Sequence, residues 1–263
     1  MRAIRKARKR AIEGAALAME AGLKALGVAS PSVLLLLGHM RSGSTLLLHL
    51  LLTNPEVAAL GERGAVYASR ADFARLAVAA RIRRGSPLRG LRYVADQVNH
   101  DQLTPNASLL QDPRLKILFL LRRPQSSVSS IVELYRVHYP QPWPPSRAVD
   151  YYVGRLAALM RLAQSLPDPS SAALVRYEAV TQTPKETLEA LRTFLSLRQG
   201  FSQTYATHSF TGRAGDPGPN IGIGRILGYR TPPPIELPQP ELERATRAYD
   251  ECSSALARFA LPA

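Results

Sequence analysis

The chain has 263 residues, of which 46% are apolar and 21% charged, and its formal net charge is +14. This composition predicts a folded globular protein, excludes a disordered or fibrous one, and favours an anionic partner such as nucleic acid, a membrane surface or a multiply charged small molecule. The single cysteine, Cys252, excludes an internal disulfide and a cysteine metal cage. Arg-rich, Ala-rich usage is typical of a bacterial protein, and no signal segment follows the basic N-terminus, so we expect a cytoplasmic location.

Residues 1–30 differ from the rest and form the first of two predicted parts. Six of the first ten residues are Lys or Arg, and apolar residues then recur at steps of four and three. This spacing predicts a basic amphipathic helix that ends near Gly27, before Pro31. Packing on the main domain, residues 31–263, is the simpler interpretation. Peripheral contact with a membrane is the alternative that we retain, and we expect no nucleic-acid partner. The periodic residues are Ile12, Ala16, Met19, Leu23 and Leu26.

Residues 31–263 contain repeated strand–turn–helix units. Short continuous apolar runs predict buried parallel strands, and helices are expected after each. The class is therefore α/β, a three-layer α/β/α arrangement with a mainly parallel central sheet, in which ligands bind at the carboxyl ends of the strands. The predicted strands are 32–37, 115–121 and 172–177, and the predicted helices are 46–52, 70–84, 126–135, 147–165, 184–195 and 240–259.

A first phosphate-binding loop is predicted at Gly38–Thr45, between the first strand and its helix. It has the G-x-x-x-x-G spacing of a P-loop, but Ser44 stands where the Walker lysine belongs. Backbone N–H groups of Ser42 to Thr45 at the helix N-terminus can bind a phosphate, and the helix dipole favours an anion there. The hydroxyls of Ser42, Ser44 and Thr45 add donors, and Arg41 adds a cation. A plain Gly/Ser turn is the alternative.

A second phosphate site is predicted at the end of the second strand. Arg122 ends this strand, and Ser130 follows eight residues later, within the next helix. An arginine and a hydroxyl can bind a phosphate by charge-assisted hydrogen bonds. The alternative is that Arg122 and Arg123 face solvent and the serines cap the helix.

Taken together, Arg41–Leu47 and the Arg-x-Pro element at Arg122, with its serine eight residues on, resemble the sulfotransferase family that uses 3′-phosphoadenosine 5′-phosphosulfate (PAPS). The resemblance covers about residues 33–226. It implies a P-loop-NTPase-like sulfotransferase fold, PAPS as sulfonyl donor and no metal. The segment Arg176–Glu178 resembles the family's Tyr-Glu-Asp element, which makes Tyr177 either an adenine contact or a core residue. The implied 5′-phosphosulfate contacts are Arg41, Ser42, Gly43, Ser44 and Thr45, and the implied 3′-phosphate contacts are Arg122 and Ser130.

A general base is expected near the transferred group, because an attacking hydroxyl must lose its proton. Family members commonly place a catalytic histidine at the position of His100, and Asp96–His100 resembles the Asp-Lys-x-x-His element of bacterial members. Gln97 replaces the lysine, which leaves Arg41 as the cation near the leaving group. Glu62 is the alternative base, and His39 is an alternative cofactor contact.

Two long loops carry candidate ligand contacts. Tyr139–Pro145 is rich in proline, and Gly212–Ile226 is rich in glycine. Family members often close such a glycine-rich loop over the nucleotide, a role open to Arg213 and Arg225. Trp143, Tyr139 and Tyr151 either line an acceptor site or pack in the core.

We therefore predict a sulfotransferase that acts on a hydroxyl or amine of a small-molecule or carbohydrate acceptor. In this hypothesis His100 accepts the acceptor's proton, and Arg41 with the loop N–H groups stabilises the departing phosphate. A P-loop-like kinase is one alternative, although it should carry lysine at position 44 and an aspartate for Mg²⁺. A non-catalytic basic protein that binds a nucleotide or polyanion is the other.

Overall fold

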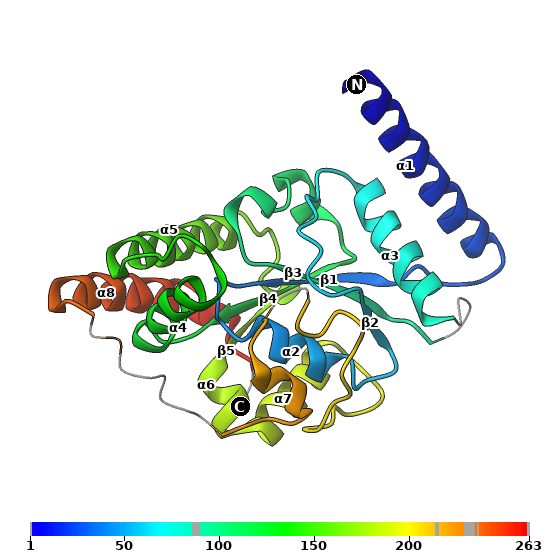
Figure 1. Ribbon diagram of the computed structural model, residues 1–263. Helices are drawn as coiled ribbons and strands as arrows, with labels where there is room; N and C mark the ends of the chain where they lie inside the picture. Colours follow the sequence, from blue (N-terminus) through cyan, green and yellow to red (C-terminus); the bar gives the residue numbers. More distant parts are fainter. Residues whose placement is uncertain (1, 86–89, 214–215, 229–234, 236, 262–263) are drawn as a thin grey trace.

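Five strands form one parallel sheet at the centre of the molecule (Figure 1). The computed structural model describes residues 2–85, 90–213, 216–228, 235 and 237–261. Every strand pairing in the sheet is parallel, so all five carboxyl ends lie at one edge, as the α/β prediction requires. In spatial order the strands are β2 (Val57–Ala59), β3 (Tyr93–Val98), β1 (Ser32–Leu37), β4 (Leu115–Leu121) and β5 (Ala172–Arg176).

Helices cover both faces of this sheet, which confirms the predicted three layers. In β1, Leu34 and Leu36 face one apolar cluster, while Leu35 and Leu37 face the other. Burial on both faces explains why this strand is a continuous apolar run. The first cluster includes α2 (Ser44–Leu51), α6 (Tyr177–Gln182) and α7 (Pro184–Phe194), and the second includes α3 (Arg70–Arg84), α4 (Pro124–His138), α5 (Pro145–Gln164) and α8 (Gln239–Ala255).

The strand prediction was incomplete, because β2 and β3 were missed. Strand β2 has three residues, too few to form an apolar run. Strand β3 carries Asp96 and Gln97, which are polar yet buried at 0% and 1% exposure. The hydroxyl of Tyr67 donates to Asp96 Oδ2 at 2.5 Å. The buried carboxyl group of Asp96 therefore has a hydrogen-bond partner that is distant in sequence. Tyr177, predicted to end the third strand, begins α6 instead.

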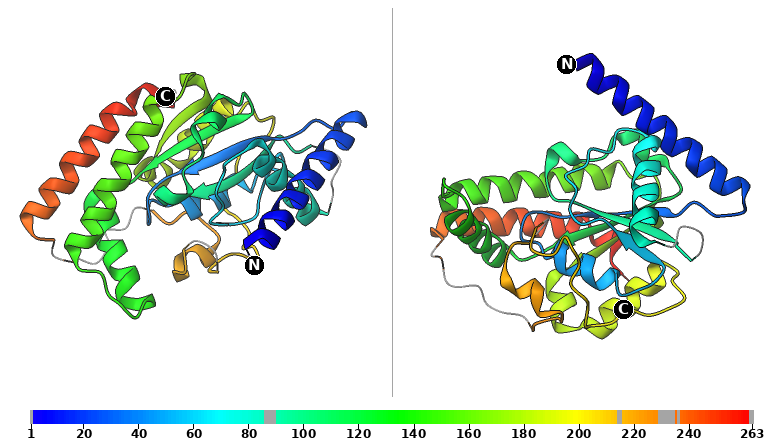
Figure 2. Two further views of the ribbon diagram at one scale, coloured as in Figure 1. Left: turned by 90° about the horizontal axis from the view of Figure 1, so that it is seen from above. Right: turned by 45° about the vertical axis from the view of Figure 1, so that its right-hand side comes forward.

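The predicted N-terminal helix is present as α1 (Arg2–Ala25), and it packs on α3. Glu13 lies 3.8 Å from Arg75 of α3, and Glu20 lies 3.0 Å from Arg114. The N-terminal end of α1 projects beyond the rest of the molecule (Figures 1 and 2). Across the described residues, no helix has both the length and the apolar content needed to span a bilayer.

Candidate active site

The loop between β1 and α2 is shaped by two residues with positive φ. Gly43 has φ 92° and precedes α2, and Arg41 has φ 64°. A Cβ on Gly43 would lie 2.3 Å from the ring of Tyr177, so both the backbone and the available space require glycine. Because the first N–H groups of a helix lack intrahelical partners, this turn directs the N–H groups around Ser44 and Thr45 toward a ligand.

The two predicted phosphate sites face the same cavity. Arg41 Nε donates to Ser130 Oγ at 2.8 Å, and Arg122 Nη1 donates to the backbone oxygen of Arg41 at 2.9 Å. The cavity has a volume of about 790 Å³. Its wall contains twelve of the residues singled out from the sequence: Arg41, Gly43, Ser44, Thr45, Glu62, His100, Arg122, Ser130, Tyr139, Tyr177, Arg213 and Arg225.

Three other residues singled out from the sequence do not reach this wall. Ser42 is fully buried, and its N–H donates to the backbone oxygen of His39 at 3.1 Å, so this N–H is not directed at a ligand. His39 is also fully buried, and burial lowers its pKa to about 3. The side chain of Gln97 is buried as well. Within the predicted phosphate loop, Gly43, Ser44 and Thr45 thus line the cavity and Ser42 does not.

Tyr177 is part of the cavity and not of the core. Its ring is half-buried, packs against Gly43 and lies 4.2 Å from the guanidinium carbon of Arg122 in a cation–π contact. The backbone around Arg122 is held from behind: Tyr152 donates to its backbone oxygen at 2.8 Å, and Glu178 accepts from the N–H of Arg123 at 3.0 Å. An aromatic face and an arginine are thus fixed side by side.

Both candidate bases line the cavity near the end of β3. His100 is half-buried, and burial, followed by the positive charge of Arg155, lowers its pKa. Burial raises the pKa of Glu62, and a hydrogen bond from Asn99 Nδ2 at 3.3 Å opposes that rise. Asn99 Nδ2 also donates to Ser44 Oγ at 3.1 Å, which links Glu62 to the phosphate loop. Asn99 was missed in the sequence, although it adjoins His100.

The three aromatic residues proposed for an acceptor wall have different positions. Tyr139 lines the cavity and is 50% exposed. Trp143 stacks on Tyr135, with 3.9 Å between the ring centroids, and is not among the residues that line the cavity. Tyr151 binds backbone: its hydroxyl accepts from the N–H of Met40 at 2.8 Å and donates to the oxygen of Asn99 at 2.6 Å.

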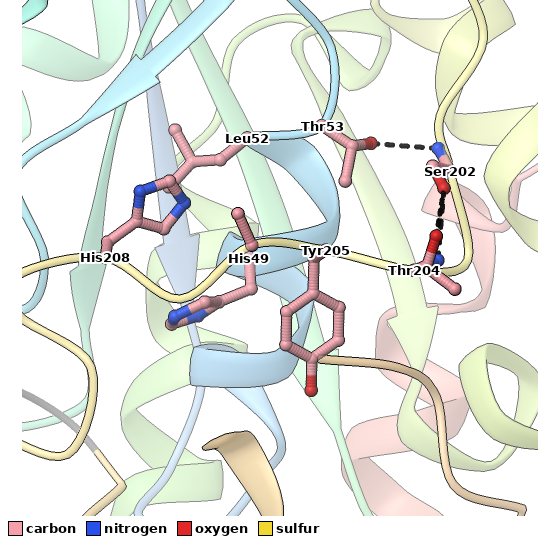
Figure 3. A pocket seen from close by; sticks show the side chains of 8 residues that line it. His49, Leu52, Thr53, Ser202, Thr204, Tyr205 and His208 are labelled. Atoms are coloured by element: carbon pink, nitrogen blue, oxygen red, sulfur yellow. Dashed lines mark hydrogen bonds between the residues drawn. The ribbon is translucent and has the colours of Figure 1, made fainter. Parts of the chain in front are cut away.

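A smaller hollow of about 400 Å³ lies on the flank of α2, where the chain from Ser202 to His208 crosses it (Figure 3). The N–H of Ser202 donates to Thr53 Oγ1 at 2.9 Å. His49 of α2 is fully buried and hydrogen-bonds to Thr211 Oγ1 at 2.8 Å. These hydrogen bonds join the segment that precedes the glycine-rich loop to α2 and to Thr53 just after it.

The glycine-rich loop itself is bonded to the phosphate loop. Asp216 donates its N–H to Thr45 Oγ1 at 3.1 Å and accepts from Arg41 Nη1 at 2.5 Å. Arg213 and Arg225 of the same loop lie on the cavity wall. Residues 214 and 215, also in the loop considered from sequence, lie outside the described residues. The loop thus forms part of the cavity wall.

The comparisons with known proteins decide the fold. No protein-family model and no curated protein matches the sequence. A sulfotransferase from Alicyclobacillus acidocaldarius matches with a TM-score of 0.52 and 15% identity, over 87% of this chain and 95% of that chain. The sulfotransferase domain of the Synechococcus PCC 7002 olefin synthase matches with a TM-score of 0.50 and 16% identity, over 84% and 94%. The chain has the sulfotransferase fold. The predicted fold is therefore confirmed.

Arg155 holds this sulfotransferase fold together directly beneath the site, and it was missed in the sequence. It is 2% exposed and donates to the backbone oxygens of Gly38 at 2.7 Å and Val98 at 2.6 Å, and to Asp101 Oδ1 at 2.8 Å. It thereby ties the end of β1 to the end of β3 on both sides of His100. The available signal was an arginine on the buried stripe of a helix, where a charge requires partners.

Replacing Gly43 with alanine should destabilise the site. The positive φ and the contact with Tyr177 both oppose a side chain, so we expect the free energy of unfolding to fall by about 1–3 kcal/mol. Gly200→Ala is the matched control, because a Cβ there meets nothing within 4 Å. Urea unfolding monitored by circular dichroism measures both, and equal stability of the two variants would contradict the account of this turn.

Replacing Arg155 with methionine should lower the free energy of unfolding by about 2–4 kcal/mol, because buried carbonyl oxygens lose their donors. Arg161→Met, on an exposed position of the same helix, should change it by less than about 0.5 kcal/mol. The same urea titration compares the two. A small effect at Arg155 would show that water or other donors replace the guanidinium.

Proposed function

We propose that the protein transfers a sulfonyl group from PAPS to a hydroxyl or amine of an acceptor. The observation that carries the proposal is that the loop Gly43–Thr45, Arg122 and Ser130 line the same cavity. A nucleotide with separate 5′ and 3′ phosphate ends matches two anion sites that are hydrogen-bonded neighbours. The sulfotransferase fold supports the same proposal.

The donor fits the residues of the cavity. The helix N-terminus at Ser44 and Thr45 binds the 5′-phosphosulfate, and Arg122 with Ser130 binds the 3′-phosphate. The ring of Tyr177, held beside Arg122, offers a face for adenine. A volume of about 790 Å³ lies within the range of cofactor sites and leaves room for part of an acceptor.

The reaction is an in-line displacement at sulfur. The acceptor oxygen or nitrogen forms a bond to sulfur while the bond from sulfur to the bridging phosphate oxygen breaks. The acceptor's proton passes to His100, whose lowered pKa keeps the imidazole neutral and able to accept it. Negative charge grows on the departing phosphate, where Arg41 and the N–H groups near Gly43 stabilise it.

A kinase is the second candidate, since the loop resembles a P-loop. Ser44 in place of the Walker lysine disfavours it, because that lysine contacts the β- and γ-phosphates in P-loop enzymes. Thermal shift separates the two. Adenosine 3′,5′-bisphosphate should stabilise the protein more than ATP with Mg²⁺ does, and the opposite order would favour a kinase.

Arg122→Ala should weaken binding of adenosine 3′,5′-bisphosphate by about tenfold to a hundredfold, because a charge-assisted hydrogen bond to the 3′-phosphate is lost. Binding of adenosine 5′-monophosphate, which has no 3′-phosphate, should change much less. Arg123→Ala is the matched control, because the side chain of Arg123 is exposed. Titration calorimetry measures the affinities of the unaltered protein and the two variants for each nucleotide. Equal losses of affinity for the two nucleotides in Arg122→Ala would contradict a role of Arg122 at the 3′-phosphate.

His100→Gln should lower the rate of sulfonyl transfer by about 10²–10⁴-fold and leave the affinity for adenosine 3′,5′-bisphosphate unchanged. In the unaltered protein kcat/KM should fall as the pH drops through the pKa of His100, which lies below its ordinary value, because the protonated ring cannot accept a proton. Glu62→Gln should retain this acidic limb.

The rate assay first requires an acceptor, which incubation with labelled PAPS and an extract of the source cell identifies by mass analysis. Loss of activity in Glu62→Gln with retention in His100→Gln would make Glu62 the base.

A further inference from the structure

Two exposed apolar side chains of α1 and a third directly after its end lie on one line, because the N–H of Leu26 continues the helical hydrogen bonding to the oxygen of Gly22 at 3.2 Å. Ile12, Met19 and Leu26 are 49%, 40% and 77% exposed. They are seven residues apart, and each step of seven rotates the position by only about 20° around a helix. Ala16, by contrast, is buried, so α3 covers one side of the apolar stripe predicted from the sequence and leaves this edge open.

The same helix carries the most basic segment of the chain. It has seven Lys and Arg residues, six of them within positions 2–10 and the last at Lys24. Its two acidic residues, Glu13 and Glu20, are paired with Arg75 and Arg114 of the main domain. By sequence, α1 therefore has an excess of five positive charges, on the same element that carries the exposed apolar residues.

Exposed apolar and basic residues also lie at the end of α3. Arg81 Nη2 donates to the backbone oxygen of Ala29 at 2.7 Å, which brings the C-terminal end of α3 close to the chain that follows α1. Ile82 is 66% exposed there, and Arg84 is exposed as well.

We propose that α1 docks on an anionic lipid bilayer, with Ile12, Met19 and Leu26 inserted at the level of the head groups and the basic residues against lipid phosphates. A helix with an apolar line and a large cationic excess matches this surface in both respects. Nucleic acid would engage the charges and leave the apolar line exposed. A second copy of α1 would bring like charges together. This inference is independent of sulfonyl transfer.

Vesicle flotation with the full chain tests the proposal. The protein should float with vesicles of phosphatidylcholine and phosphatidylglycerol, should stay behind with phosphatidylcholine alone, and should be released by high salt. The triple variant Ile12→Gln, Met19→Gln, Leu26→Gln keeps every charge and should reduce the partition coefficient by about tenfold or more. Leu17→Gln is the matched control, because Leu17 is 43% exposed but lies off this line.

Unchanged partition of the triple variant, or equal binding to neutral vesicles, would overturn the proposal. So would binding of a random-sequence DNA duplex in preference to anionic vesicles, or a dimer in solution that the triple variant abolishes. A thermal melt of the triple variant and its titration with adenosine 3′,5′-bisphosphate are the controls for an intact main domain. We expect both to match the unaltered protein, because the three replaced side chains are exposed.

Discussion

The candidate site depends on one buried guanidinium. Arg155 binds the carbonyl oxygens of Gly38, which begins the predicted phosphate loop, and of Val98 in β3, and it also binds the carboxylate of Asp101. Parallel strands end at a common edge but do not by themselves fix the relative positions of the loops that follow. The guanidinium, with five donors in one plane, fixes the turn that begins the phosphate loop and the turn that carries His100 as a unit.

Around this centre, the cavity is closed by polar contacts between segments far apart in sequence. Arg41 bonds to Ser130 on α4 and to Asp216 on the glycine-rich loop, and Asp216 also bonds to Thr45. Phosphate loop, second anion site and covering loop therefore form one hydrogen-bonded network. A change at any member is expected to reach the others, because such networks are not additive. The contacts proposed for the donor and the wall formed by the glycine-rich loop thus share residues.

The sequence predicted those parts of the site that depend on local patterns, and it missed those that depend on contacts between distant residues. Apolar runs buried on both faces identified β1, β4 and β5, and the glycine of the phosphate loop and Arg122 followed from their places at strand ends. Strand β3 was missed because Asp96 and Gln97 break its apolar pattern, and the partner that compensates the burial of Asp96, Tyr67, is distant in sequence. Arg155 and Asn99 were missed because their partners are backbone oxygens and side chains distant in the chain, which no local spacing reveals.

Burial shifts the pKa values of the two proposed bases, His100 and Glu62, in opposite directions. It lowers the pKa of the histidine, which keeps the ring neutral, and it raises the pKa of the glutamate, which makes its carboxylate the stronger base. Desolvation is the first cause in both cases, so neither shift by itself distinguishes the two. The two residues differ in their hydrogen-bonded neighbours. The carboxylate of Glu62 is linked through Asn99 to Ser44. The backbone before His100 is bonded to Tyr151 at Asn99 and to Arg155 at Val98. The proposed role of His100 requires an acceptor in line with sulfur, and the hydrogen-bonded backbone before this residue supports that placement.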